Sequence, residues 1–273
     1  MSLISRVKSK LYYKYATWFS GGNTLVFPEE LGAKKNIFIY FDYEREFGGH
    51  NTSISDKNIL TLLNLLDNYK IKATWFTVGR NFNKYPMSIK AVLKRGHEIG
   101  SHTYNHVAPY NISRNKLKQD FSLFEQASKY FCKVKGFHSP NGKWNLSLLQ
   151  LLAKNNYSYD VIGEKFLRKG VIAIKGKNSI LRLPTIGDDW SLYSKNKSQA
   201  EVYCHFADLY KSIGTGEVGG IGAHPWVLFS NPNIFEGYKQ FLEFISQSNG
   251  TNINTAQHFV DLFKKVIHSN LID

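Results

Sequence analysis

Short apolar runs alternate with stripes of helical period along most of this chain, and this alternation constrains the fold more than any other feature. The apolar runs are typical of strands, which are expected at 37–42, 73–78, 97–101, 134–138, 158–163, 171–175, 180–185, 218–223 and 251–254. The stripes predict helices after Ser55 and Ser113, at 88–95, 145–155, 198–213 and 234–247, and from Thr255. Strands that alternate with helices pair in parallel, so we expect an α/β fold with a barrel-like sheet.

Two histidines four residues apart, His102 and His106, follow the strand expected at 97–101. On a helical turn this spacing places both rings on one face, close enough to share a metal ion. Such a pair alone is a weak signal. Asp42 and Glu44 strengthen it, because strand alternation at the end of the first expected strand points both carboxylates to one side. One carboxylate can then bind the metal while the other acts as a base, which is the division that a hydrolytic metal site needs.

Five polar segments fall at or just after the ends of expected strands, where barrel enzymes carry their active sites. They are Phe41-Asp42-Tyr43-Glu44, Ser101-His102-Thr103-Tyr104-Asn105-His106, Gly136-Phe137-His138-Ser139-Pro140-Asn141, Asp188-Asp189-Trp190 and Gly222-Ala223-His224-Pro225-Trp226. In this order, over about residues 37–263, they resemble the motifs of the polysaccharide deacetylases, the NodB-homology group of carbohydrate esterases. The two acids of the first segment are more commonly adjacent in that family. The third segment has His138 where the family usually has an arginine.

The resemblance implies a single distorted (β/α) barrel of seven or eight strands, similar to a TIM barrel. It implies that Glu44, His102 and His106 bind one divalent metal ion. Zinc is the expected ion, and cobalt, nickel, iron and manganese also suit this ligand set. Asp42 would be the general base that activates the attacking water, and His224 the general acid that protonates the leaving amine.

Further roles follow from the same resemblance. The backbone N–H of Asn141 would stabilise the oxyanion. The family's arginine contacts the base and the acid of the fourth motif, and His138 could pair with Asp189 instead. A histidine is shorter than an arginine and titrates near neutrality, so we expect a changed pH profile.

Four residues are predicted to bind the substrate. Trp190 and Ile221 would wall a small pocket for the acetyl methyl group, and Trp226 ends the fifth segment. His50 lies in the loop after Glu44, and loops at this end of a barrel often bind ligands.

The chain of 273 residues has 35 Lys+Arg against 21 Asp+Glu, a formal charge of +14. This balance favours anionic lipid, anionic saccharides or nucleic acid as partners, or else reflects a lysine-rich proteome. We expect no nucleic-acid binding, because no motif for it is present. The first 24 residues combine lysines and arginine with apolar residues at helical spacing, and the lysines interrupt any signal-peptide core.

We therefore expect residues 1–24 to lie as a helix in the interface of an anionic membrane, with a helix packed on the catalytic domain as the alternative. Residues 25–36 are expected to be a linker, and residues 37–273 the catalytic domain. Without an export signal, the predicted location is cytoplasmic, at the inner face of the membrane. The predicted substrate is an N-acetylated saccharide, lipid-linked or anionic, in surface-glycan synthesis.

The predicted enzyme is thus a metal-dependent carbohydrate deacetylase that hydrolyses an N-acetyl amide. Alternatives on the same fold are a deformylase, an O-acetyl esterase or a hydrolase of a non-sugar amide. A carbohydrate-binding relative without catalysis is a further alternative. The presence of both Asp42 and His224 argues against it, because such a protein needs neither a base nor an acid.

Overall fold

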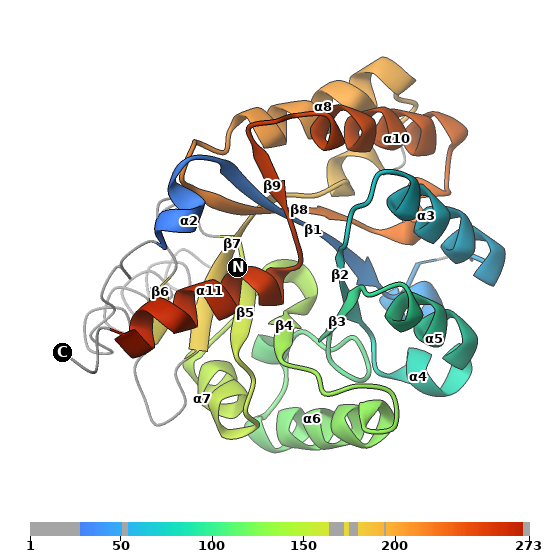
Figure 1. Cartoon of the computed structure of the whole chain (residues 1–273). Coiled ribbons are helices and arrows are strands. Elements are labelled where there is room, and N and C mark those ends of the chain that lie inside the picture. The colour runs from blue at the N-terminus through green and yellow to red at the C-terminus, as the bar shows by residue number, and fades with distance from the viewer. Residues whose placement is uncertain (1–27, 51–53, 164–171, 175–179, 194, 270–273) are drawn as a thin grey trace, which may run out of the picture.

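The computed structural model describes residues 28–50, 54–163, 172–174, 180–193 and 195–269. Their strands form one sheet (Figure 1). The strands are β1 (Lys35–Tyr43), β2 (Thr74–Thr77), β3 (Glu98–Ser101), β4 (Gly136–His138), β5 (Tyr159–Ile162), β6 (Ile172–Ile174), β7 (Ile180–Gly187), β8 (Val218–Ala223) and β9 (Thr251–Ile253). The order β2-β3-β4-β5-β7-β8-β1 closes through a further pairing of β1 with β2. All these pairings are parallel, which confirms the predicted (β/α) barrel, here of seven strands. Strand β9 adds in parallel to β1, and β6 adds antiparallel to β7.

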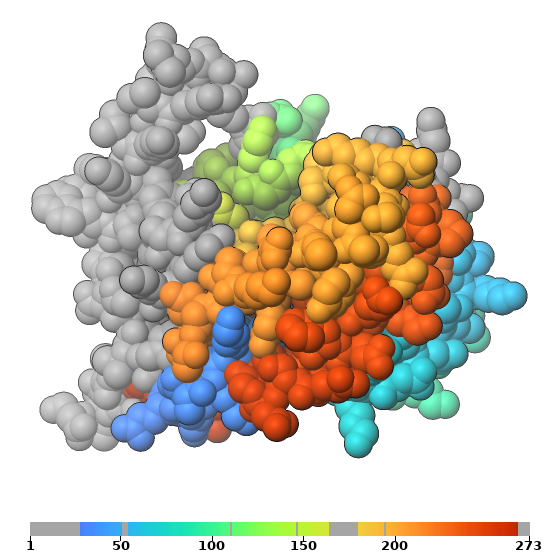
Figure 2. Space-filling view, turned by 90° about the horizontal axis from the view of Figure 1, so that it is seen from above, coloured from blue at the N-terminus to red at the C-terminus, as the bar shows by residue number. Residues whose placement is uncertain are grey.

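Helices surround the barrel (Figure 1). They are α2 (Glu29–Gly32), α3 (Asp56–Asn68), α4 (Arg80–Lys84), α5 (Pro86–Lys94), α6 (Arg114–Ser128), α7 (Leu146–Lys154), α8 (Gln199–Lys211), α9 (Pro225–Leu228), α10 (Pro232–Ser246) and α11 (Ala256–Ser269). As predicted, Ser55 and Ser113 are the N-caps of α3 and α6, and each side chain accepts a backbone N–H. Helices α8 and α10 lie side by side on one outer face (Figure 2). Among the described helices, none is long and apolar enough to cross a membrane.

Aromatic side chains fill the barrel interior, and each meets a glycine on the neighbouring strand. Phe38 and Tyr40 of β1 are register partners of Gly220 and Gly222 of β8. A methyl group on either glycine would lie 2.3–2.4 Å from the facing ring, so only glycine leaves room for it. The register pairs Phe76–Gly100 and Tyr159–Gly136 repeat this arrangement around the barrel. The close fit gives a packed interior below the ends of the strands.

Helix α11 closes the barrel at the N-terminal ends of the strands, and it crosses this end in Figure 1. Phe259, Val260 and Phe263 of α11 are buried in one cluster with the aromatic residues of the interior. The helix begins on the barrel itself, because the N–H of Gln257 donates to Glu98 Oε2 at 3.0 Å. Among the described residues, α11 thus seals this end, and the predicted polar segments lie at the opposite, C-terminal ends of the strands.

The prediction of a linker at residues 25–36 is wrong for the part that the structure describes. Helix α2 lies there with Leu31 fully buried, and β1 already begins at Lys35. The side-chain amide of Asn36 donates to the carbonyl of Leu31 at 2.9 Å, which ties the helix to the strand. The segment 1–24, predicted to be interfacial, lies outside the described residues.

Candidate active site

The chemically active side chains meet at the C-terminal ends of the barrel strands. Asp42 lies in β1 and Glu44 directly after it, while His102 follows β3, His138 ends β4 and His224 follows β8. All five side chains are buried. The topology therefore brings together the residues that the sequence predicted for metal binding and for acid–base catalysis.

Glu44, His102 and His106 offer three ligand atoms that all lie within 4.8 Å of one another. Glu44 Oε1 lies 2.9 Å from His106 Nε2 and 3.5 Å from His102 Nε2. The Nδ1 of His102 lies 2.8 Å from the backbone carbonyl of His138, to which it donates, so its Nε2 is left free for a metal. One carboxylate and two imidazoles suit zinc or a similar divalent ion, so the residues present fit the metal that the resemblance implies.

The loop that carries the histidine pair is not the helical turn that the spacing predicted. Thr103 and His106 have φ values of 61° and 56°, so the backbone turns through the left-handed region between the two rings. Asp120 of α6 holds this loop, because its carboxylate accepts the backbone N–H of Tyr104 at 2.6 Å and of Asn105 at 3.0 Å. Sequence reasoning missed Asp120, whose only signal was a charge within the apolar stripe of a helix.

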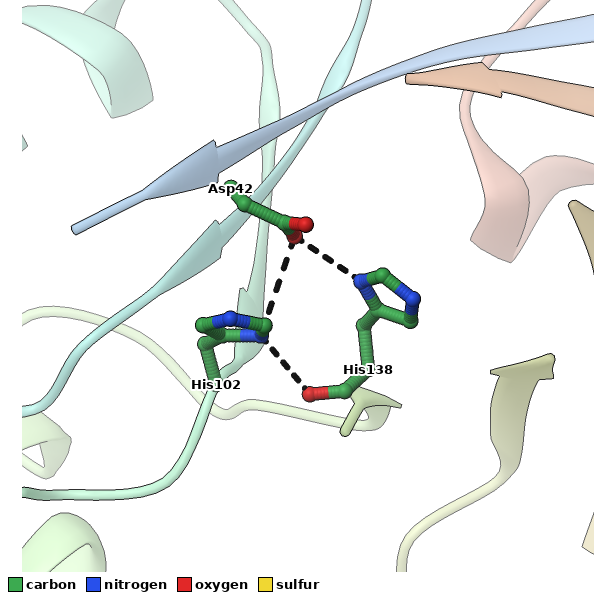
Figure 3. Close-up of side chains that lie close together, drawn as sticks. All are labelled: Asp42, His102 and His138. Carbon is green, nitrogen blue, oxygen red and sulfur yellow. Dashed lines mark hydrogen bonds and ion pairs between the residues drawn. The ribbon is translucent and has the colours of Figure 1, made fainter. Parts of the chain in front are cut away.

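A second set, Asp42, His102 and His138, also lies within metal-binding distance (Figure 3). His138 Nδ1 lies 2.9 Å from Asp42 Oδ1, and His102 Nδ1 lies 3.7 Å from the same oxygen. The Nδ1 of His102 is already engaged by the His138 carbonyl. A metal here would displace that hydrogen bond, so the set with Glu44 and His106 is the better metal site. The predicted pairing of His138 with Asp189 is wrong, because His138 contacts Asp42, the predicted base, instead.

Asp189 pairs with His224. Its Oδ1 lies 2.6 Å from His224 Nδ1, and its Oδ2 accepts the backbone N–H of the same residue at 2.8 Å. These two bonds fix the ring, and His224 Nε2 faces Asp42 Oδ2 at 3.7 Å. Asp189 is therefore the group that orients the predicted acid.

Burial and neighbouring charges shift the pKa values of the site residues in different directions. Burial raises the pKa of Asp42, but the charges of His138 and His102 outweigh it and lower the pKa to about 2. Burial likewise opposes ionisation of Glu44, yet hydrogen bonds from His102 and His106 hold its pKa well below the usual value. Burial lowers the pKa of His102, which favours the neutral, metal-binding form. Burial also opposes the charge on His224, but Asp189 outweighs it and raises the pKa of His224 to about 10.

Only some of the residues predicted to bind the substrate or the oxyanion are exposed near the site. Trp190 is 54% exposed, and its ring centroid lies 6.1 Å from that of His224. His50 is partly exposed, and its ring lies 5.6 Å from that of Trp190. Asn141 follows β4 in an exposed turn with φ 61°. These three positions remain predictions for substrate and oxyanion binding.

Two of the substrate-binding predictions are wrong. Ile221 belongs to the outer core, because its neighbours Gly220 and Gly222 face the barrel interior and alternation turns Ile221 toward the helices. Trp226 is fully buried and cannot stack on a substrate. Its indole N–H instead donates to Glu44 Oε2 at 2.9 Å.

Comparisons with known proteins agree with this geometry. Residues 31–159 match the family model for polysaccharide deacetylase. A peptidoglycan-N-acetylglucosamine deacetylase of Bacillus cereus is 38% identical over 100 residues, which are 35% of this chain and 46% of that protein. The chain spans about half of the length, or less, of the first curated relatives that it matches.

Solved structures share the fold. One from Mycobacterium smegmatis, assigned to the polysaccharide deacetylases, superposes with a TM-score of 0.73 at 16% identity and covers 89% of this chain and 94% of its own. The Puue allantoinase superposes with a TM-score of 0.68 at 15% identity, with 88% and 94% covered. The family match over residues 31–159, which include the first three of the five motifs, and the shared barrel fold confirm the predicted resemblance: this part of the chain belongs to the polysaccharide deacetylase family.

Proposed function

We propose that this protein removes an N-acetyl group from a sugar by hydrolysis, with one divalent metal ion, zinc by preference, bound by Glu44, His102 and His106. The observation that carries the proposal is the pairing of a base and an acid beside this ligand set. Asp42 and His224 face each other across 3.7 Å, and their pKa values are shifted in opposite directions. Such a split supports Asp42 as the base and His224 as the acid.

When bound, the metal supplies a Lewis acid that polarises the scissile carbonyl and lowers the pKa of water from about 15.7 toward about 7. Asp42 Oδ1 is held by His138, so Oδ2 is the atom that takes the proton from the attacking water. The water oxygen then bonds to the carbonyl carbon. The N–H of Asn141, in the turn after β4, would donate to the resulting oxyanion.

The C–N bond breaks when the leaving nitrogen receives a proton from His224 Nε2. Asp189 keeps that nitrogen pointed at the site, and its negative charge keeps the ring protonated. The products are an amine and acetate. An amide needs this proton more than an ester does, because an unprotonated amine is the poorer leaving group. The protonated His224 therefore favours amide hydrolysis over an O-acetyl esterase.

The substrate class is the less constrained part of the proposal. The Bacillus cereus relative is described as a peptidoglycan-N-acetylglucosamine deacetylase, which favours an N-acetylated saccharide. The exposed ring of Trp190 beside His224 provides an apolar surface for a sugar or an acetyl group. A hydrolase of a non-sugar amide is the second candidate, because the allantoinase has the same fold.

We further propose that the enzyme acts at the cytoplasmic face of a membrane on a lipid-linked saccharide in surface-glycan synthesis. The support is the formal charge of +14 and the basic, apolar composition of residues 1–24. Membrane flotation of the whole chain and of a form without residues 1–24 tests this placement. Binding to anionic vesicles that depends on these residues supports it, and equal solubility of both forms contradicts it.

Acetate and formate release tests the reaction. N-acetylated oligosaccharides, lipid-linked N-acetylated sugars, a formamido sugar and allantoin would be offered to the zinc-loaded wild type and to Asp42→Asn. Acetate release from a saccharide that falls in Asp42→Asn supports the proposal. Activity on allantoin alone would favour the second candidate, a hydrolase of a non-sugar amide. Activity on the formamido sugar alone would identify a deformylase. Zinc binding without cleavage of any of these would contradict the proposed substrates.

A further inference from the structure

The two carboxylate oxygens of Glu44 have different surroundings. Oε1 faces the imidazole nitrogens of His102 and His106. Oε2 accepts the indole N–H of Trp226 at 2.9 Å and lies 3.4 Å from His50 Nε2. One oxygen of this buried carboxylate thus faces the candidate metal site, and the other contacts Trp226 and His50.

The side chain of Trp226 is itself held in place by its neighbours, so it can fix the orientation of Glu44. It lies fully buried in α9, two residues after His224, and His50 stacks on its ring with centroids 3.8 Å apart. Tyr193 packs against the same ring edge-on at 4.7 Å. Burial alone does not guarantee such a bond, because the indole nitrogen of the equally buried Trp75 has no hydrogen-bond partner among the described residues.

Gly48 closes the space around Oε2. A methyl group at this position would lie 2.3 Å from Glu44 Oε2 and 2.9 Å from a ring carbon of His50. Atoms do not approach this closely, so any larger residue would push the carboxylate or the imidazole out of place. Oε2 is therefore enclosed by an indole, an imidazole and bare backbone, all of them supplied by segments outside the histidine loop.

We propose that Trp226 is a positioning residue for metal binding: with Gly48 and His50, it holds Oε2 of Glu44 and leaves Oε1 as the single ligand atom. The inference rests on the metal site of the proposed function and adds a residue to it. A carboxylate that is already oriented loses little conformational freedom when it binds the ion. Partners that orient metal ligands in this way typically account for about 10–100-fold in metal affinity.

Trp226→Phe removes the indole N–H and keeps an aromatic ring, and Trp75→Phe is the matched control with no bond to lose. Zinc affinity would be measured by competition with a chelator, after circular dichroism has shown that each variant is folded. We expect about 10–100-fold weaker binding for Trp226→Phe and wild-type binding for Trp75→Phe. Wild-type affinity in a folded Trp226→Phe would overturn the inference. That result would leave acetate release by the wild type intact, so it is distinct from failure of the proposed function.

A second measurement covers the case in which Trp226→Phe does not fold. With ¹⁵N-labelled tryptophan, the indole N–H signal of Trp226 can be assigned by substituting the other tryptophans one at a time. We expect this signal to move when zinc is added to the wild type, and to differ in metal-free Glu44→Gln. A signal that stays in place in both experiments would overturn the inference.

Discussion

Each end of the barrel holds a carboxylate, Asp42 buried at one end and Glu98 partly buried at the other, and the partners at the two ends are of opposite kinds. At the C-terminal ends of the strands, Asp42 lies among imidazoles, whose charges lower its pKa to about 2 despite burial. At the other end, Glu98 receives hydrogen bonds from the Tyr159 hydroxyl at 2.5 Å, the Thr74 hydroxyl at 2.8 Å and the N–H of Gln257 at 3.0 Å. These donors are neutral, burial prevails, and the pKa of Glu98 is raised.

The partners of a carboxyl group that is shielded from water, rather than burial itself, therefore decide whether the group is ionised and which role it can take. An acid that stays ionised among titratable rings can take a proton from a substrate water. An acid among neutral donors in a sealed end organises structure, and here it anchors the first turn of α11. Substitutions at the two ends should therefore affect different properties.

The largest effect is expected from Asp42→Asn. Loss of a general base lowers kcat by about 10²–10⁴-fold, whereas zinc binding should persist because Glu44, His102 and His106 are unchanged. The kcat of the zinc-saturated variant and its metal content check this. Glu98→Gln, the equivalent change at the sealed end, is the control and should retain kcat within a few-fold. A comparable loss of kcat in both variants would break the contrast between the ends.

The pH–rate profile tests the acid. The pKa of His224 is raised to about 10 by Asp189, against the effect of burial. The rate should therefore fall on the alkaline side as His224 loses its proton. Asp189→Asn removes the charge that raises this pKa, so its alkaline limb should move to lower pH and its kcat should fall. An alkaline limb that is identical in both proteins would show that His224 is not the acid.

His97, next to Glu98, gives a stability change that depends on pH. Its Nδ1 accepts the N–H of Ala73 at 3.1 Å, and burial lowers its pKa from 6.5 to about 4. Between about pH 6.5 and about pH 4, His97 binds a proton in the unfolded chain but not in the folded protein. The free energy of unfolding should therefore fall as the pH falls through this range. The shift corresponds to at most about 3 kcal/mol. Urea unfolding across this range, with His97→Asn as a neutral replacement that keeps an acceptor, checks it; equal pH slopes would contradict the assignment.

A smaller effect is expected from Glu98 itself. Glu98→Ala leaves the buried hydroxyl of Tyr159 and the N–H of Gln257 without their acceptor, which costs about 1–3 kcal/mol. Glu98→Gln keeps an acceptor and should cost less. Because the folded pKa is raised, the wild type should lose stability relative to Glu98→Gln as the pH rises above about 4.5, opposite in sign to the effect of His97. Chemical unfolding of the three proteins at pH 4 and pH 7 distinguishes these outcomes.

Local patterns predicted most of the fold. The apolar runs and the caps Ser55 and Ser113 are encoded within a few residues, and they appear in the structure where they were expected. The short helices α4 and α9 were missed, because four or five residues are too few to show a helical period. The α2 region was misassigned because its fold depends on contact with distant strands.

Long-range contacts account for the rest of the site. The motifs predicted which residues would gather, since parallel strands place their C-terminal ends together. They could not predict that Trp226 binds Glu44, 182 residues away in the chain. Nor could spacing show that the turn between His102 and His106 is left-handed, because Asp120 on another element stabilises it.

The central claim is that the metal binds at Glu44, His102 and His106 rather than at Asp42, His102 and His138. Zinc stoichiometry and affinity in His106→Ala, Glu44→Gln, Asp42→Asn and His138→Asn test it most directly. We predict one zinc per chain in the wild type, lost or severely weakened in the first two variants and retained in the last two. Retention in His106→Ala and Glu44→Gln, with loss in Asp42→Asn and His138→Asn, would place the metal in the other set and contradict the assignment of Asp42 as the base.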